Sequence, residues 1–315
     1  MRVDIHQHLW TEPLVAALAR RDEPPYVRRI DGEWVLRIPG EPDWALQPAT
    51  LDLEARAEEV RRDGVDLALV APSSPVGFEA LPADQARPLV EAHLEGLAGA
   101  PECFAAWGVL ALADARPAEV DDLLDRGHVG LSLPAGAIAT PAGLDRCGPW
   151  LECLERRDAP LFVHPGPAPW SRPVPHPGGA PLWWPALTGY VAEMNAAWHA
   201  FVAAGRSAHP RLRVAFAMLA GVAPVHLERL AARGGPAGAG LEPDVYYDTS
   251  SYGERTVDAM VRCVGIDQIV YGSDRPVVGP APWGLGQAAR HAALVENPQR
   301  LLSGARAAAP ARAYA

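Results

Sequence analysis

The sequence predicts a single α/β domain folded as a (β/α)8 TIM barrel, and a repeated pattern indicates it. Short runs rich in Val, Ile, Leu and Phe recur, and each is followed by a longer stretch with helical periodicity. Eight such runs are present, and eight parallel strands close most readily into a barrel. The expected strands are Val3–His6, Leu67–Ala71, Phe104–Val109, Val129–Leu133, Leu161–His164, Leu212–Ala217, Val245–Thr249 and Gln268–Tyr271.

The stretches between these runs carry apolar residues at the spacing that covers the outer wall of a barrel. Hydrophobic residues make up 49% of the 315 positions, which is enough to bury one large core. We therefore expect one domain over residues 1–304 and a flexible Ala-rich tail over 305–315. The expected helices are Asp52–Asp63, Asp84–Gly99, Leu144–Arg157, Gly189–Gly205 and Pro224–Arg233.

Two stretches interrupt the βα rhythm. Between Glu23 and Pro48 the phrase RIDGEWVLRI places an Asp-Gly pair between short alternating strands. This pattern predicts a small β-hairpin inserted after strand one, over about residues 23–48. The second stretch, Pro165–Pro185 after strand five, is crowded with Pro, Gly and Trp. Both a lid over the barrel mouth and a plain exposed insertion fit such a long loop.

The charge of the chain narrows the classes of partner. A formal net charge of −10 and a pI near 5.5 leave no basic field for phosphate backbones, which excludes nucleic acid and favours a small-molecule substrate. The opening MRVDIHQHLW lacks the pattern of a signal peptide, and no apolar run reaches membrane-spanning length. We therefore expect a cytoplasmic protein without a membrane partner.

The chain contains no lysine, so all 28 basic residues are arginines. Schiff-base catalysis, a P-loop lysine and a carbamylated-lysine metal bridge are excluded, because each needs an ε-amine. The four cysteines are scattered without metal-ligand spacing and indicate small buried side chains in a reducing compartment.

Three strand ends carry side chains that suit a metal ion. His6 and His8 are two positions apart on an extended strand, so both imidazoles face the same side. His164 ends strand five and Asp274 follows strand eight, at the rim where barrels build active sites. Each of these side chains alone could instead be a hydrogen-bonded rim residue or could cap a turn. To exclude a metal site, however, this alternative must apply to all four residues together. We expect one divalent cation, Zn²⁺ first, with Mn²⁺, Fe²⁺ or Co²⁺ as alternatives.

Several phrases resemble a known group of enzymes, the amidohydrolase superfamily, in the branch that includes aminocarboxymuconate semialdehyde decarboxylase. The resemblance implies a mononuclear (β/α)8 enzyme with His6, His8, His164 and Asp274 as ligands, and Asp274 as the acid–base group beside His164. Homodimers are common in this branch. The phrases are DIHQH, DGVDLALV, LFVHPGP, RVAFAMLAGVAPVHLERL, YYDTSSYG, IVYGSDRPVV and ENPQRLLSG.

The chain departs from this family after strand six. Met218 stands where the family carries a His followed by Gly-Gly, and a thioether cannot shuttle a proton. His176 in the strand-five loop and His199 on the next helix are alternative sources of an imidazole, although surface positions fit both.

Further residues are candidates for substrate contacts. Arg229 matches the position of an arginine that holds a substrate carboxylate in the family's decarboxylases; an outward helical Arg paired with Glu228 or Asp258 fits equally. Asp248 on strand seven and Arg275 beside Asp274 are candidate partners behind the ligands, where they would orient a ligand without reacting. The other candidate substrate contacts are Trp10, His176, Trp183 and Arg275, and plain packing also fits the two Trp residues.

Three functions fit these observations. The sequence ranks first a metal-dependent hydrolase that uses metal-activated water on an amide, lactam or lactone, because water attack needs only a metal and an Asp base. The alternative is a non-oxidative decarboxylase of a small aromatic or dienoic acid. The third is a catalytically degenerate barrel with a binding role.

Overall fold

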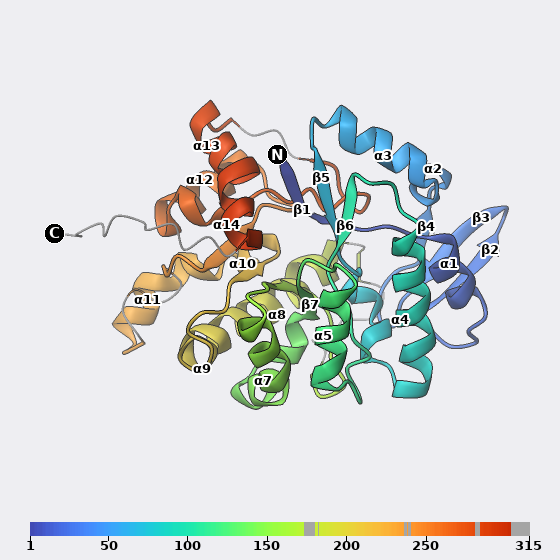
Figure 1. The fold of residues 1–315 in the computed structure, drawn as a ribbon, viewed down its shortest axis with the longest axis horizontal. Helices are drawn as coiled ribbons and strands as arrows, with labels where there is room; N and C mark the ends of the chain where they lie inside the picture. Colours follow the sequence, from blue (N-terminus) through green and yellow to red (C-terminus); the bar gives the residue numbers. More distant parts are fainter. Residues whose placement is uncertain (173–179, 182, 236–237, 239–240, 281–283, 304–315) are drawn as a thin grey trace.

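The structure is a computed structural model that describes residues 1–172, 180–181, 183–235, 238, 241–280 and 284–303. Across these residues, eight short parallel strands form the centre of the molecule, and each overlaps one of the expected runs (Figure 1). They are β1 (Val3–Gln7), β5 (Leu67–Val70), β6 (Phe104–Ala106), β7 (Leu131–Pro134), β8 (Leu161–His164), β9 (Val214–Phe216), β10 (Val245–Asp248) and β11 (Ile269–Val270).

The strands follow one another around a ring. Hydrogen bonds order them as β1-β5-β6 in one sheet and β7-β8-β9-β10-β11 in another, always parallel. Two isolated parallel bridges join the sheets, Gly108 with Leu131 after β6 and Gln7 with Arg275 after β11. Every strand therefore has a neighbour on both sides, and the predicted (β/α)8 barrel is confirmed.

Aromatic side chains fill the barrel below its carboxyl end. Trp107 stacks on Phe162 with ring centroids 5.2 Å apart, and its indole N–H donates to the Ile5 carbonyl over 2.9 Å. The edge of Phe162 lies against the ring of His6, with centroids 5.1 Å apart. Because all three side chains are fully buried, this packing forms a rigid apolar floor beneath the histidine.

Helices cover the outside of the ring, and each expected helix is overlapped by an observed one (Figure 1). Local signals explain some starts: Asp52 accepts hydrogen bonds from the Glu54 and Ala55 amides, and Thr140 accepts from Gly143. The helices are α1 (Glu12–Ala19), α2 (Pro48–Leu51), α3 (Leu53–Arg62), α4 (Ala83–Ala98), α5 (Pro117–Asp125), α6 (Ala135–Ile138), α7 (Pro141–Arg156), α8 (Trp183–Ala200), α9 (Arg206–Ala208), α10 (Met218–Gly221), α11 (Leu227–Ala232), α12 (Glu254–Val264), α13 (Gln287–His291) and α14 (Asn297–Ser303).

The insertion after β1 contains the predicted hairpin and one strand more. β2 (Tyr26–Ile30) and β3 (Glu33–Arg37) are joined by Asp31 and Gly32, whose φ angles of 51° and 88° suit a tight hairpin turn. β4 (Trp44–Leu46) then pairs with β3, so the insertion is a three-stranded antiparallel sheet. The hairpin prediction was incomplete because a three-residue strand shows too little alternation to be recognised.

Two predictions concern residues that the structure leaves undescribed. Positions 173–179 and 182 of the predicted lid, and the predicted tail over 305–315, lie outside the described residues, so both stay predictions. None of the helices described is both long and apolar enough to cross a membrane.

Barrel closure between β6 and β7 predicts one stability effect. A side chain at Gly130 would collide with the Pro160 carbonyl oxygen and lie 2.9 Å from the Trp107 ring. We expect Gly130→Ala to lower the free energy of unfolding by about 3 kcal/mol, because overpacking at such a site displaces the backbone. Gly99→Ala is the control, since nothing lies within 4 Å of its added methyl. Thermal unfolding should show a Tm lowered by several degrees for Gly130→Ala alone; equal Tm values would contradict this packing.

Candidate metal centre

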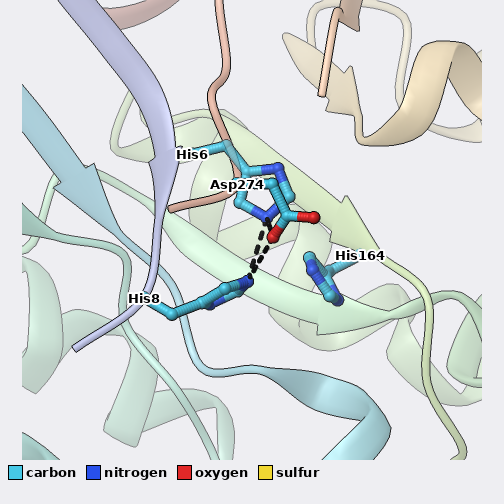
Figure 2. Close-up of side chains that lie close together, drawn as sticks. All are labelled: His6, His8, His164 and Asp274. Atoms are coloured by element: carbon cyan, nitrogen blue, oxygen red, sulfur yellow. Dashed lines mark hydrogen bonds and ion pairs between the residues drawn. The ribbon is translucent and has the colours of Figure 1, made fainter. Parts of the chain in front are cut away.

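The four predicted ligands lie together at the carboxyl end of the barrel. His6 and His8 come from the end of β1, His164 is the last residue of β8, and Asp274 follows β11. All four are buried, and one potential ligand atom from each lies within 4.8 Å of the others (Figure 2). Figure 2 shows the imidazoles of His6 and His8 meeting the Asp274 carboxylate, with His164 facing them from across the barrel.

Backbone hydrogen bonds hold the segment of His6 and His8 beside the segment of Asp274. The Asp274 amide donates to the His6 carbonyl over 2.9 Å, and the His8 amide donates to the Arg275 carbonyl over 2.7 Å. Asp274 has a φ of 58°, a left-handed conformation that Asp adopts more readily than most residues. Strand closure of the barrel therefore sets the spacing between the first two histidines and the carboxylate.

Asp4 reinforces this junction, and sequence reasoning missed it. Its carboxylate accepts hydrogen bonds from the amides of His6 and Ser273, both over 3.1 Å, and from the Gln7 side chain over 2.9 Å. Burial raises the pKa of Asp4 to about 6, although these hydrogen bonds lower it. The signal was present, because Asp4 stands between the apolar Val3 and Ile5 on a buried strand.

Each histidine uses Nδ1 for a hydrogen bond to the protein. His6 Nδ1 lies 2.6 Å from Asp248 Oδ2, His8 Nδ1 lies 2.9 Å from the Ala71 carbonyl, and His164 Nδ1 lies 2.9 Å from the Pro165 carbonyl. Since carbonyl oxygens only accept, Nδ1 of His8 and His164 must carry the proton. Nε2 of these two rings, when neutral, is then left with a lone pair, which is the form that binds a metal.

The distances fit a single small cation. His6 Nε2 is 3.2 Å from His8 Nε2, and Asp274 Oδ1 is 3.0 Å from His8 Nε2 and 3.5 Å from His6 Nε2. Bonds of about 2.1 Å in a tetrahedral site separate ligand atoms by about 3.4 Å. Two lone pairs this close repel each other unless a proton or a cation lies between them. The cluster can therefore hold one divalent ion, and its N3O donor set suits both Zn²⁺ and Mn²⁺.

The protonation states also suit a metal site. Burial, followed by the charges of His6 and His8, holds the pKa of His164 well below its usual value. Burial raises the pKa of Asp274, but the three histidines outweigh it and leave the pKa lowered. Burial lowers the pKa of His6, but Asp248 and Asp274 reverse this and leave it raised. At neutral pH, His164 is therefore neutral and Asp274 is ionised.

Asp248 orients the first ligand from behind. It is fully buried, and its carboxylate lies so close to Gly272, which follows β11, that an added Cβ there would be 2.1 Å from Oδ1. A carboxylate bonded to the far nitrogen of a ligating histidine fixes the tautomer and the orientation of the ring. The structure thus places Asp248 behind a ligand, as the sequence suggested for this strand end.

The side chains of two predicted substrate contacts are engaged elsewhere in the structure, and their contact with a substrate stays a prediction. The guanidinium of Arg275 pairs with Asp63 over 2.7 Å and with Glu59 over 3.6 Å, so it binds the carboxylates beside α3. Trp10 is 2% exposed and packs edge-on against Trp44, with ring centroids 5.5 Å apart. Arg275 is therefore held in an ion pair, and Trp10 belongs to the core between α1 and the inserted sheet.

The remaining candidates lie at the surface or outside the described residues. Arg229 is exposed on α11, on the side of the molecule opposite the inserted strands (Figure 1), and its grip on a substrate carboxylate stays a prediction. Trp183 begins α8 and is 54% exposed, so its role in a pocket wall also stays a prediction. His176 lies outside the described residues. The ring of His199 is held by the Asn195 carbonyl over 2.8 Å.

An acidic group near the cluster was not predicted. The Tyr190 hydroxyl on α8 donates to the Glu41 carboxylate of the insertion, and the Gly166 amide donates to Glu193 over 3.1 Å. Burial first, then Glu41 and more weakly Glu193 and Asp274, raise the pKa of Tyr190. Sequence could not pair Glu41 with Tyr190, because 149 positions separate them.

Comparisons with known proteins agree on the fold. No protein-family model matches the chain, and no curated protein sequence matches it. In three dimensions, the chain is similar to IDCase from Metarhizium anisopliae, with a TM-score of 0.79, 19% identity and coverage of 96% of this chain and 97% of that one. The similarity therefore spans essentially both whole chains.

Two other solved structures overlap the chain almost completely. The 5-carboxyvanillate decarboxylase of Novosphingobium aromaticivorans, complexed with manganese and 4-hydroxy-3-methoxy-5-nitrobenzoic acid, gives a TM-score of 0.73 at 18% identity and 96% coverage of both chains. The 2,6-dihydroxybenzoate decarboxylase from Rhizobium gives 0.66 at 16% identity, covering 96% of this chain and 98% of that one. These TM-scores show that the chain shares the fold of these structures, in line with the sequence resemblance.

The raised pKa of His6 predicts a pH-dependent metal affinity. A protonated imidazole cannot bind a cation, so protons compete at His6 at a higher pH than at an ordinary histidine. Between pH 7.5 and 5.5 we expect Mn²⁺ to bind more weakly by more than the roughly tenfold that one unperturbed histidine gives. Titration calorimetry measures this change, with circular dichroism confirming the fold at each pH. An affinity that is constant across this range would contradict the assignment of His6 as a ligand.

Proposed function

We propose that the chain is a metal-dependent, non-oxidative decarboxylase of a small aromatic or dienoic carboxylic acid. The observation that carries the proposal is the buried cluster of three imidazoles and one carboxylate at the carboxyl end of the barrel. Overlap with decarboxylase structures over 96% of the chain supports this reaction over others. The hydrolase that the sequence ranked first is supported by the wider resemblance alone and by the loss of the family's His at Met218, which a decarboxylase of this family normally has.

The proposed reaction breaks one carbon–carbon bond. Carbon dioxide leaves, the electron pair of the broken bond stays on the substrate carbon, and that carbon takes up one proton. When bound, a divalent cation supplies a Lewis acid that holds and polarises an anionic oxygen of the substrate. Three neutral imidazoles and one carboxylate leave a net positive charge on such a site, which favours an acidic substrate.

Asp274 is the group that we assign to the proton transfer. Its side chain is 12% exposed, and its Oδ2 lies 3.4 Å from the Ser251 hydroxyl, away from the two histidines of β1. Because the neighbouring histidines keep its pKa low, the carboxylate is ionised in the free protein. It must therefore take up a proton from solvent before handing it to the substrate carbon.

Two hydrogen bonds connect the segments around the cluster. The Tyr190 bond to Glu41 ties the insertion to α8, and the Glu193 bond to Gly166 ties α8 to the loop that follows His164. We infer a single-domain protein that binds a small acid in the cytoplasm as a homodimer. Its net charge of −10 argues against nucleic acid and anionic membranes as partners.

Carbon dioxide release tests the proposal. Protein loaded with Mn²⁺ should release carbon dioxide from at least one acid in a panel of hydroxybenzoates, muconates and unsaturated ring carboxylates. His164→Ala should lower that rate by at least about 100-fold, because losing a ligand is more severe than losing a partner behind it. His291→Ala is the control, since this histidine is exposed on α13.

Other outcomes would overturn the proposal. Hydrolysis of lactones or amides with no carbon dioxide release would restore the hydrolase. Equal behaviour of His164→Ala and wild type in every assay would favour an inert barrel.

A further inference from the structure

A left-handed turn replaces the segment where the family resemblance leads us to expect a histidine. Five consecutive residues have φ angles between 50° and 59°, although only one is glycine: Met218, Leu219, Ala220, Gly221 and Val222. A left-handed conformation costs about 1–2 kcal/mol for each residue with a side chain. The turn therefore stores strain and persists only if surrounding contacts hold it.

Contacts at both ends hold the turn. The Met218 amide donates to the Ser250 hydroxyl over 3.2 Å, and the Gly221 carbonyl accepts from the Asn195 side chain over 2.6 Å. A side chain at Gly221 would lie 2.8 Å from the Val191 carbonyl of α8, so the turn is also packed closely against this helix. Ser250 is 1% exposed, and its hydrogen bond is thus shielded from water.

Ser250 also binds the carboxylate behind the first ligand. Its hydroxyl donates to Asp248 Oδ2 over 2.9 Å, and its amide donates to Asp248 Oδ1 over 2.6 Å. The same Oδ2 atom lies 2.6 Å from His6 Nδ1. A continuous chain of hydrogen bonds therefore runs from the Met218 amide through Ser250 and Asp248 to His6, and every member is buried.

We propose that Ser250 is a positioning residue for the metal centre, which acts through Asp248 on His6 and anchors the strained turn with the same hydroxyl. The hydroxyl is suited to this because it accepts one hydrogen bond and donates another, whereas Asp248 as a carboxylate only accepts. Without it, Asp248 Oδ2 keeps only its hydrogen bond with His6, the carboxylate is freer to rotate, and the His6 ring loses its fixed orientation. The Met218 amide is left buried without its partner.

This inference rests on the proposed metal site and not on the reaction carried out there. Its consequence is a link between the turn after β9 and the ligand on β1, which are far apart in the sequence. The unexpected Met218 then contributes through its backbone amide, and its side chain needs no acid–base role.

The test compares Mn²⁺ affinity among serine variants of the whole chain. Ser250→Ala should raise the Kd for Mn²⁺ by about 10–100-fold, the range found when the partner of a ligand is lost. Ser250→Thr, which keeps the hydroxyl, should recover most of this loss. Ser132→Ala is the matched control: it removes a buried hydroxyl on β7 that has no hydrogen-bond partner among the described residues, so the Kd should not change.

A second measurement separates positioning from stability. Nitrogen-15 spectra of the metal-free protein should report a single Nδ1–H tautomer for His6 in wild type and a mixture in Ser250→Ala. If the alanine variant fails to fold, Ser250→Cys replaces it, because a thiol is close in size and a weak donor. A Kd within threefold of wild type, with an unchanged His6 tautomer, would overturn the inference. A wild-type protein that binds no Mn²⁺ would overturn the metal site itself.

Discussion

The arrangement of the site depends on the meeting of imidazole Nε2 atoms in a buried space. His6 Nε2 and His8 Nε2 are 3.2 Å apart, with Asp274 Oδ1 3.0 Å from the latter. Either a shared proton or a cation relieves the repulsion between two lone pairs at this distance, and the protein holds the two atoms there because each Nδ1 is engaged in a hydrogen bond. The barrel around the site can be understood as the framework that keeps these bonds in place.

Barrel closure supplies that framework. The first and last strands meet where the amides of His8 and Asp274 bond across the junction, and Asp4 ties the same strands together. β8, four strands along one arc of the ring, brings His164 to the same end. The stacked rings of Trp107 and Phe162 pack beneath His6 and fill the barrel interior below the cluster. Close packing of the barrel interior thereby fixes the positions of the four charged and polar side chains of the cluster.

Periodicity and strand ends predicted the barrel, its eight strands and the convergence of the four ligands. These features are local in sequence, since each predicted ligand lies within a few positions of the end of an apolar run. The features that the sequence did not predict are long-range contacts or an element too short to show a pattern. The guanidinium of Arg275 forms ion pairs with Asp63 and Glu59. The Tyr190 hydroxyl donates to Glu41, and the three-residue β4 completes the inserted sheet. The left-handed turn at Met218 could not be expected, because four of its five residues carry side chains that disfavour it.

Metal content tests the central claim most directly. The wild-type protein and a His6→Ala, His8→Ala double variant, both shown to be folded by circular dichroism, would be compared by elemental analysis after exposure to Mn²⁺ or Zn²⁺ and removal of excess ion. The account predicts about one equivalent of divalent metal in wild type and far less in the variant. Equal metal in both proteins, or none in a fully folded wild type, would contradict it.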